Sequence, residues 1–394
     1  VSSRSVSPHV SPSEWFLGYP VLHSSVPNNR PTKRSFVSPV VDAFVANISQ
    51  RMKDVELASV FTNAFPNALD TTIQSFNATG RAAIADNKEV SKQDLKSVEE
   101  SAKAITLSND QEILHVLSKD YEIDGQDGIK VPLGMSGIAL DGRYHLVTGA
   151  KNARDNIEKC IKKCSISPEK VVLEQLASSI SVLTEDEKNL GVCLVDIGGG
   201  TTDIAIFSNG AIEYTSSLSL GGDQVTNDLA QALKTSTYNA EELKITHGCI
   251  NNEILNDDIV EVPGVGDRPP RSVQKHTLVE VMSLRYQEIF DFVNSKILQS
   301  GFEEKISAGI VLTGGSSKSD GLIDLAEEVF HKQVRLGVPQ HIYGGSEDVV
   351  KNPEYAACIG LLLYAKKQNN PLIEPLNENF LSVAKKLLKN FLYN

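Results

Sequence analysis

Three consecutive glycines and two threonines stand between acidic residues in the stretch VCLVDIGGGTTDIAIF, from Val192 to Phe207. Glycine lets a backbone approach a polyanion closely and tolerates positive φ, so the N–H groups of such a loop can cradle phosphates. Asp196, at the end of an apolar run, is suited to hold Mg²⁺ through water, and the threonine hydroxyls add donors. The stretch therefore predicts a nucleotide-binding loop with a metal ligand.

A second glycine loop, LTGGSS at 312–317, also follows an apolar run. Two such loops indicate two walls of one cleft; the alternative is that the glycines serve only tight turns. The chain has no GxxxxGK[ST] motif, and GVGDRP at 264–269 does not fit the GxGxxG pattern. Both the P-loop and the dinucleotide fingerprint are therefore excluded.

Strands alternating with amphipathic helices must position these loops. We expect strands at Val192–Ile197, Ile204–Phe207 and Ile310–Leu312, because each is a short apolar run bounded by turn residues. A helix should follow the Gly-Gly pair that precedes Asp223, with Asp223 as its cap. A long amphipathic helix is predicted at 274–298, where apolar residues recur every three or four positions.

The first half of the chain predicts a small α+β unit. A helix is expected at 89–105, because Ser91 and Asp94 have the spacing of a capping box. Strands around a turn are expected near 112–125, and the pair Asp141-Gly142 predicts a hairpin turn. A further helix is expected from residue 152 to 164.

Composition sets limits on the function of the 394-residue chain. Its net charge is −12 and no long Lys/Arg block occurs before the C-terminus, which argues against a nucleic-acid partner. The five cysteines lack C-x-x-C spacing, which indicates free thiols in a reducing compartment rather than structural zinc. The serine-rich first thirteen residues predict disorder. We expect a cytosolic protein.

Three segments resemble the actin and Hsp70 superfamily. LGVCLVDIGGGTTDIAI resembles its second phosphate loop, AEELKITHG its ribose-contacting Glu-x-x-Lys and GIVLTGGSS its adenosine loop. Within the superfamily, segments 114–140 and 262–289 resemble the FtsA family of bacterial cell division proteins. The resemblance runs from about residue 84 to 366 and implies an α/β fold: a duplicated, actin-like (RNase H-like) ATPase fold with an inserted α+β subdomain of SHS2 type.

The resemblance also implies the site residues for ATP and Mg²⁺. The carboxylate of Asp196 is the metal ligand, and Glu174 orients the attacking water unless it is an ordinary surface residue. The residues expected at the nucleotide are Asp196, Gly198, Gly199, Gly200, Thr201 and Thr202 for phosphates and metal, Glu241 and Lys244 for ribose, Gly314, Gly315 and Ser316 for adenosine, and Gly222 as a further cofactor-binding residue.

The superfamily fold is a duplication, so a strand ending in Asp-x-Gly-[Thr/Ser] is expected near the N-terminus. The segment SVSPHVSPSEWFLGYP stands there instead, and we expect the first phosphate-loop strand to be missing. The expected subdomains are 1A at 1–83, 163–186 and 350–366; 1C at 84–162; 2A at 187–225 and 304–349; and 2B at 226–303.

The C-terminal stretch has the composition of a membrane anchor. Residues 367–378 are polar and contain two prolines, which predicts a linker, and residues 379–394 predict an amphipathic helix. A basic amphipathic helix suits an anionic bilayer surface; the alternative is a terminal helix docked on the domain. The apolar face consists of Phe380, Val383, Leu387, Leu388 and Phe391, and the basic residues are Lys385, Lys386 and Lys389.

The resemblance implies a protein that binds ATP, assembles into filaments and tethers the FtsZ ring to the cytoplasmic face of the bacterial membrane at the division septum. Later division proteins would be recruited there. The C-terminal peptide of FtsZ would dock on 226–303, with Arg285 and Glu288 as candidate contacts, and any ATPase activity would be weak. The alternatives are a nucleotide-free scaffold and an ATPase or kinase of the same fold.

Overall fold

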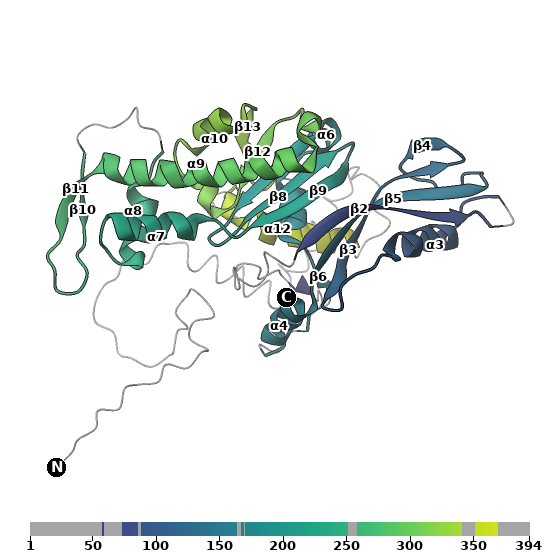
Figure 1. The fold of residues 1–394 in the computed structure, drawn as a ribbon, viewed down its shortest axis with the longest axis horizontal. Coiled ribbons are helices and arrows are strands. Elements are labelled where there is room, and N and C mark those ends of the chain that lie inside the picture. Colours follow the sequence, from purple (N-terminus) through teal and green to yellow (C-terminus); the bar gives the residue numbers. More distant parts are fainter. Residues whose placement is uncertain are drawn as a thin grey trace, which may run out of the picture. The chain divides into compact units, whose positions relative to one another are not determined.

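The computed structural model describes residues 57–58, 73–85, 88–163, 167–168, 170–250, 258–340 and 351–368. All of these residues belong to one compact unit. Two larger sheets, of five and four strands, organise this unit (Figure 1). The predicted disordered segment 1–13, the helix 379–394 and most of the linker 367–378 lie outside the described residues.

The five-stranded sheet has the order β13-β12-β7-β8-β9. Strands β13, β12 and β7 run parallel, whereas β7, β8 and β9 are joined in antiparallel pairs. The sheet confirms the three strands predicted in this region. Its members are β7 (Val192–Ile197), β8 (Thr202–Ser208), β9 (Ala211–Leu218), β12 (Ile310–Thr313) and β13 (Val334–Leu336).

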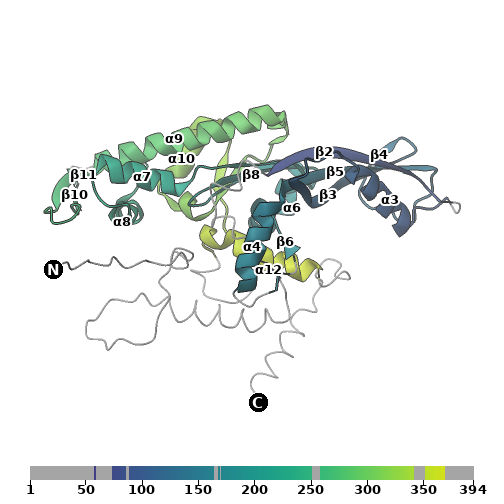
Figure 2. The same cartoon turned by 60° about the horizontal axis from the view of Figure 1, so that its bottom comes forward.

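Helices cover both faces of this sheet, which explains why β7 and β8 are buried along their whole length. Cys193, Val195 and Ile197 share a hydrophobic cluster with one set of helices, and Leu194 belongs to a second cluster with Val182 on the other face. Figure 2 shows the first set above the sheet and α12 below it. The first set is α7 (Gly222–Ala232), α9 (Lys275–Ser300) and α10 (Leu322–Phe330); the second is α5 (Glu174–Val182) and α12 (Ala356–Gln368).

A smaller layer extends from the sheet around α9. It contains α8 (Thr237–His247) and the antiparallel hairpin of β10 (Ile259–Val262) and β11 (Arg271–Gln274). The Arg271 guanidinium donates to the carbonyl of Leu233 at the end of α7, so the hairpin is tied to that helix. The predicted long helix is confirmed as α9. Among the described residues, none of the helices is long and apolar enough to cross a bilayer.

The four-stranded sheet has the order β2-β5-β3-β4, with α3 (Lys92–Lys103) packed on it. The predicted capping box is present, because the Ser91 side chain accepts from the Asp94 amide and Asp94 accepts from Ser91. The hairpin predicted at Asp141-Gly142 is wrong, since both residues lie inside β5. The strands are β2 (Gln74–Ala83), β3 (Gln111–Ile123), β4 (Gln126–Ile129) and β5 (Ala139–Ala150).

A polar junction joins the four-stranded sheet to the outer strand β9. Ser75 Oγ donates to Thr215 O at 2.8 Å, and Asn77 Nδ2 donates to Glu213 O at 3.2 Å, so side chains of β2 satisfy the open edge of β9. Lys119 forms an ion pair with the Glu213 carboxylate, whose side chain is only 8% exposed. The two sheets are therefore held together by hydrogen bonds and a largely buried charge pair.

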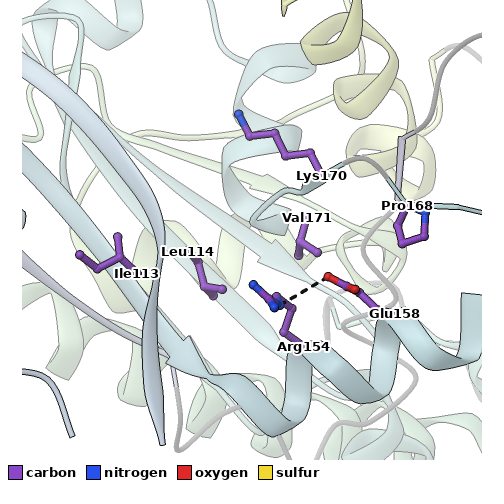
Figure 3. A pocket seen from close by; sticks show the side chains of 7 residues that line it. All are labelled: Ile113, Leu114, Arg154, Glu158, Pro168, Lys170 and Val171. Atoms are coloured by element: carbon purple, nitrogen blue, oxygen red, sulfur yellow. Dashed lines mark ion pairs between the residues drawn. The ribbon is translucent and has the colours of Figure 1, made fainter. Parts of the chain in front are cut away.

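The remaining described elements lie outside the two larger sheets. The predicted helix near 152–164 is confirmed as α4. A cavity of about 210 Å³ beside it is lined by Ile113, Leu114, Arg154, Glu158, Pro168, Lys170 and Val171, and Arg154 points toward Glu158 there (Figure 3). The connecting elements are β1 (Leu57–Ala58), α4 (Lys151–Lys163), β6 (Lys170–Val171), α6 (Glu185–Leu190) and the 3-10 helices η4 (Glu303–Lys305), η5 (Gly315–Lys318) and η6 (Pro353–Tyr355).

Candidate nucleotide-binding site

The two glycine loops lie side by side at one edge of the five-stranded sheet. Strands β7 and β12 are parallel neighbours, with Asp196 paired to Thr313, so both loops leave the sheet at the same end. Ser316 Oγ donates to Gly198 O at 2.9 Å. The two loops, predicted to be two walls of one cleft, are therefore in direct contact.

Gly314 is required where the two loops touch. Its φ is +88°, in the left-handed region that side chains rarely adopt, and a Cβ there would lie 2.4 Å from Asp196 Oδ1. The absence of a side chain thus lets the β12 loop pack against the predicted metal ligand. Gly315 has room for a side chain, because an added Cβ would have no neighbour closer than 3.8 Å.

Asp196 is buried, with 4% of its surface exposed, at the end of β7. Ser178 Oγ of α5 donates to Asp196 Oδ2 at 2.5 Å, while burial raises the pKa of the carboxyl to about 6. Asp203, which is 6% exposed, lies opposite Asp196 in the antiparallel register of β7 and β8. We did not predict Asp203 from the sequence, although the tight turn between the two strands sets the two carboxylates in register.

The carbonyls of the first loop meet the start of α7. The amide of Gly222 donates to Gly198 O at 3.0 Å, and that of Asp223 donates to Gly199 O at 2.8 Å. The predicted cap Asp223 is wrong, because Gly221 caps the helix and Asp223 lies in its first turn. A Cβ on Gly221 would be 2.6 Å from Gly199 O, so the loop leaves no room for a capping side chain.

The hydroxyls of the two loop threonines have acceptors within the protein. Thr201 Oγ1 donates to Asp203 Oδ2 at 3.1 Å, and Thr202 Oγ1 donates to Leu220 O at 2.7 Å. Both residues are buried. In this structure these protons stabilise the loop itself, and a role of the hydroxyls toward phosphate stays a prediction.

The predicted ribose residues lie beside the first turn of α7. Lys244 Nζ is 2.7 Å from Glu241 Oε2, and it donates to Gly222 O at 3.1 Å and to Thr226 Oγ1 at 2.8 Å. A Cβ on Gly222 would be 2.3 Å from Ser316 Oγ. The segments that hold Gly198, Gly222, Lys244 and Ser316 thus converge on one place.

Glu174 is the first residue of α5 and is half-buried. A Cβ added to Gly360 of α12 would meet the carbonyl of Ala177, which lies one turn after Glu174 on the same side of α5. Glu174 therefore lies on the side of α5 that faces α12. Its role in orienting water stays a prediction.

The residues that converge here fit a magnesium nucleotide. Mg²⁺ prefers carboxylate, phosphate and water oxygens, and Asp196 with Asp203 supplies two buried carboxylates. Within the described ranges, no group of three or more His, Cys, Asp or Glu could hold a metal ion. Beside these two carboxylates, a bound Mg²⁺ would use oxygens of phosphate and water as its other ligands.

Comparison with known proteins identifies the family. The family model for cell division protein FtsA matches residues 193–360, and the model for the SHS2 domain inserted in FtsA matches residues 71–148. The cell division protein FtsA of Pseudomonas aeruginosa is 50% identical over 309 residues, which cover 78% of this chain and 74% of that protein. The chain belongs to the FtsA family. FtsA of Escherichia coli K12 is 41% identical over 330 residues, covering 82% of this chain and 77% of that protein.

The predicted fold class, actin-like with an SHS2 insert, is confirmed. The solved PilM–PilN type IV pilus biogenesis complex has the same fold with a TM-score of 0.50 at 14% identity, covering 75% of this chain and 76% of that chain. Strand β2 (Gln74–Ala83) pairs in the four-stranded sheet, so this FtsA-type insert begins before residue 84. The loops around Asp196 lie in the part matched by the FtsA model.

Proposed function

We propose that this FtsA-family protein binds ATP with Mg²⁺ at the surface formed by its two glycine loops. The observation that supports the proposal most is the convergence of Gly198, Gly222, Lys244 and Ser316, which come from four separate segments. Such convergence of small and polar residues at the ends of parallel strands is typical of nucleotide sites in α/β sheets.

Each part of the site has a proposed role. The amides of Gly199 and Gly200 bind phosphate, and Asp196 and Asp203 hold Mg²⁺ through water. Glu241 and Lys244 contact the ribose, while Gly314, Gly315 and Ser316 lie against the adenosine. Glu174 orients water, and hydrolysis is weak.

Titration calorimetry of the protein with Mg²⁺-ATP tests this site. We expect binding in the micromolar to millimolar range. Asp196→Asn keeps the side-chain shape but removes the metal-binding charge, so it should weaken Mg²⁺-ATP affinity about tenfold or more. The proposal fails if the folded wild-type protein gives neither heat nor a thermal shift at millimolar Mg²⁺-ATP.

A nucleotide-free scaffold is the second candidate. The amides of Gly222 and Asp223 donate to carbonyls of the loop, and the hydroxyls of Thr201 and Thr202 have protein acceptors, so the loop is well satisfied without a ligand. A negative result in the calorimetry, from folded protein, would favour this candidate. A positive result would exclude it.

We further propose that the protein polymerises and tethers the FtsZ ring to the cytoplasmic face of the membrane at the septum. FtsZ would dock through its C-terminal peptide on the layer around α9. The Arg285 guanidinium lies 2.5 Å from Asp228 and is also paired with Glu288, while neighbouring Leu284 is 63% exposed.

A pull-down with the FtsZ tail peptide tests the docking surface. Leu284→Glu should abolish retention, because it places a charge where an apolar contact is expected. Gln299→Glu, an exposed change on the same helix, should leave retention unchanged. If folded wild-type protein retains no peptide, the proposed docking surface is wrong.

A further inference from the structure

Gln175 is a buried residue whose side-chain Nε2 has no partner in the described part of the chain. It is 1% exposed, and its Nε2 makes no hydrogen bond to any described residue. Buried side-chain donors are nearly always paired, because an unpaired one loses its hydration without compensation. The position therefore suggests that Nε2 meets an acceptor supplied by a ligand.

The direction of α5 places Gln175 at the phosphate loop. Ser178 of α5 contacts Asp196 at the end of β7, whereas Val182, one turn later, clusters with Val192 and Leu194 at its start. The helix therefore runs opposite to β7. Gln175 lies one turn before Ser178 on the same side, so it reaches the end of the sheet from which the loop leaves.

Gln175 does not share the surroundings of Glu174. Successive residues of a helix point about 100° apart. Ala177, one turn after Glu174, lies against Gly360 of α12, and Ser181 Oγ donates to Ala356 O of the same helix. Gln175 lies further around the helix, on the side where Ser178 and Val182 cover the strands.

The two faces of the sheet set the direction of a bound nucleotide. The ribose residue Lys244 packs beside α7, which belongs to the cluster on one face, whereas α5 covers the other face. A polyphosphate that starts near Lys244 and follows the loop at Gly198 would end on the side of α5. Its last phosphate is the one that Gln175 can reach.

We propose that Gln175 donates a hydrogen bond from Nε2 to an oxygen of the terminal phosphate of bound ATP. The inference rests on the proposed function, since it needs a nucleotide at this loop. A hydrogen bond to a charged acceptor in a buried site is stronger than one between neutral groups. Gln175 would thus make the site prefer ATP over ADP.

Calorimetry with Mg²⁺-ATP and Mg²⁺-ADP, combined with thermal unfolding of the free protein, tests the proposal. Gln175→Leu removes the donor at similar size, so ATP affinity should fall about tenfold to a hundredfold while ADP affinity stays within about twofold. The unfolding temperature without nucleotide should be unchanged or higher, because the unpaired amide is gone. Gln287→Leu, the same change at an exposed position of α9, should alter neither affinity.

Gln175→Glu is a second variant of nearly the same shape. Its carboxylate accepts but does not donate, so it should also lose ATP affinity selectively, and it keeps the test valid if Gln175→Leu does not fold. If the wild-type protein binds ATP and both Gln175 variants bind it with the same affinity, the inference is overturned but the proposed function is not. Equal losses for ATP and ADP would exclude the terminal phosphate as the partner. No binding by the wild-type protein would overturn the proposed function first.

Discussion

At the scale of single residues, glycines decide how closely the candidate site is assembled. Gly221, Gly222 and Gly314 each stand where an added Cβ would lie within 2.6 Å of a loop atom. Their neighbours are the loop carbonyl of Gly199, the Ser316 hydroxyl and the Asp196 carboxylate. The glycines thus serve the packing of one loop on another as much as any approach of a ligand.

Gly314 and Gly315 offer a matched pair of substitutions. Gly314→Ala forces a side chain into the left-handed region and against Asp196, so the free energy of unfolding should fall by about 1 to 3 kcal/mol. Gly315→Ala meets no atom closer than 3.8 Å and should change it by less than about 0.5 kcal/mol. Urea denaturation of both variants measures the difference, and equal losses would show that the contact with Asp196 is unimportant.

Sequence reasoning found the residues that converge here but not their local partners. The glycine loops and the Glu-x-x-Lys spacing are local patterns, so Glu241, Lys244 and Ser316 could be named in advance. Asp203 and Gln175 were missed, because their significance depends on which face of a strand or helix meets the loop. The hydrogen bond from Thr201 to Asp203 could not be foreseen, because the sequence does not show that the two side chains lie within reach of each other.

At the scale of elements, strands were easier to predict than turns. Continuous apolar runs identified β7, β8 and β12, whose neighbours bury both faces. Asp141-Gly142 resembles a hairpin turn, yet β5 continues through it because β2 and β3 pair with it on both sides. The turn after β3 lies instead at Asp124-Gly125, where both residues have positive φ.

Two buried histidines on the four-stranded sheet tie it to its neighbours. His115 Nε2 accepts from the Leu173 amide at 3.0 Å, just before α5. His145 Nδ1 and Nε2 lie 3.0 Å and 3.1 Å from Asn77 Oδ1 and Thr215 Oγ1. Burial lowers the pKa of each histidine to about 4, with a further contribution from a nearby lysine. Both rings are therefore neutral at pH 7.

These histidines predict acid sensitivity with a definite sign. The unfolded chain binds protons on each histidine below about pH 6.5 while the folded state does not, so stability is complete above pH 6.5 and falls toward pH 4. At pH 5 the loss is about 2 kcal/mol per histidine. His145→Gln should show a smaller loss than wild type between pH 7.5 and 5 in chemical denaturation.

The exposed His247 provides the control for this experiment. His247→Gln should retain the pH dependence of the wild type, because an exposed ring is hydrated in both states. If His145→Gln loses as much stability as wild type between the two pH values, the buried ring is not the source of the acid sensitivity.

At the scale of the whole molecule, the junction between the two sheets could not be predicted. Ser75 and Thr215 are separated by 140 positions in the chain, and their contact depends on which strand edges the fold leaves open. Local periodicity carries no information about such pairings. The resemblance to the FtsA family predicts the inserted subdomain, but it does not predict the contacts that join this subdomain to β9.

Attachment through the expected membrane anchor depends on many copies of the protein acting together. A Val, Leu or Phe contributes about 1.5 to 3 kcal/mol when fully buried, but an interfacial helix buries it in part and must be ordered from a coil. Each lysine adds about 1 kcal/mol near anionic lipid. One copy of 379–394 should therefore bind only at micromolar to millimolar strength, whereas assembly would raise attachment about a hundredfold by avidity.

Flotation with anionic vesicles tests this anchor. Wild-type protein should float, and the double variant Leu387→Glu with Phe391→Glu should not, because charges replace the centre of the apolar face. Asn379→Glu with Ser382→Glu adds the same two charges away from that face. It loses part of the attraction to anionic lipid but keeps the apolar face, so this control should float much better than the Leu387 and Phe391 double variant. If the Leu387 and Phe391 double variant floats like wild type, apolar insertion does not hold the protein on the membrane, and the segment is better explained as a terminal helix docked on the domain.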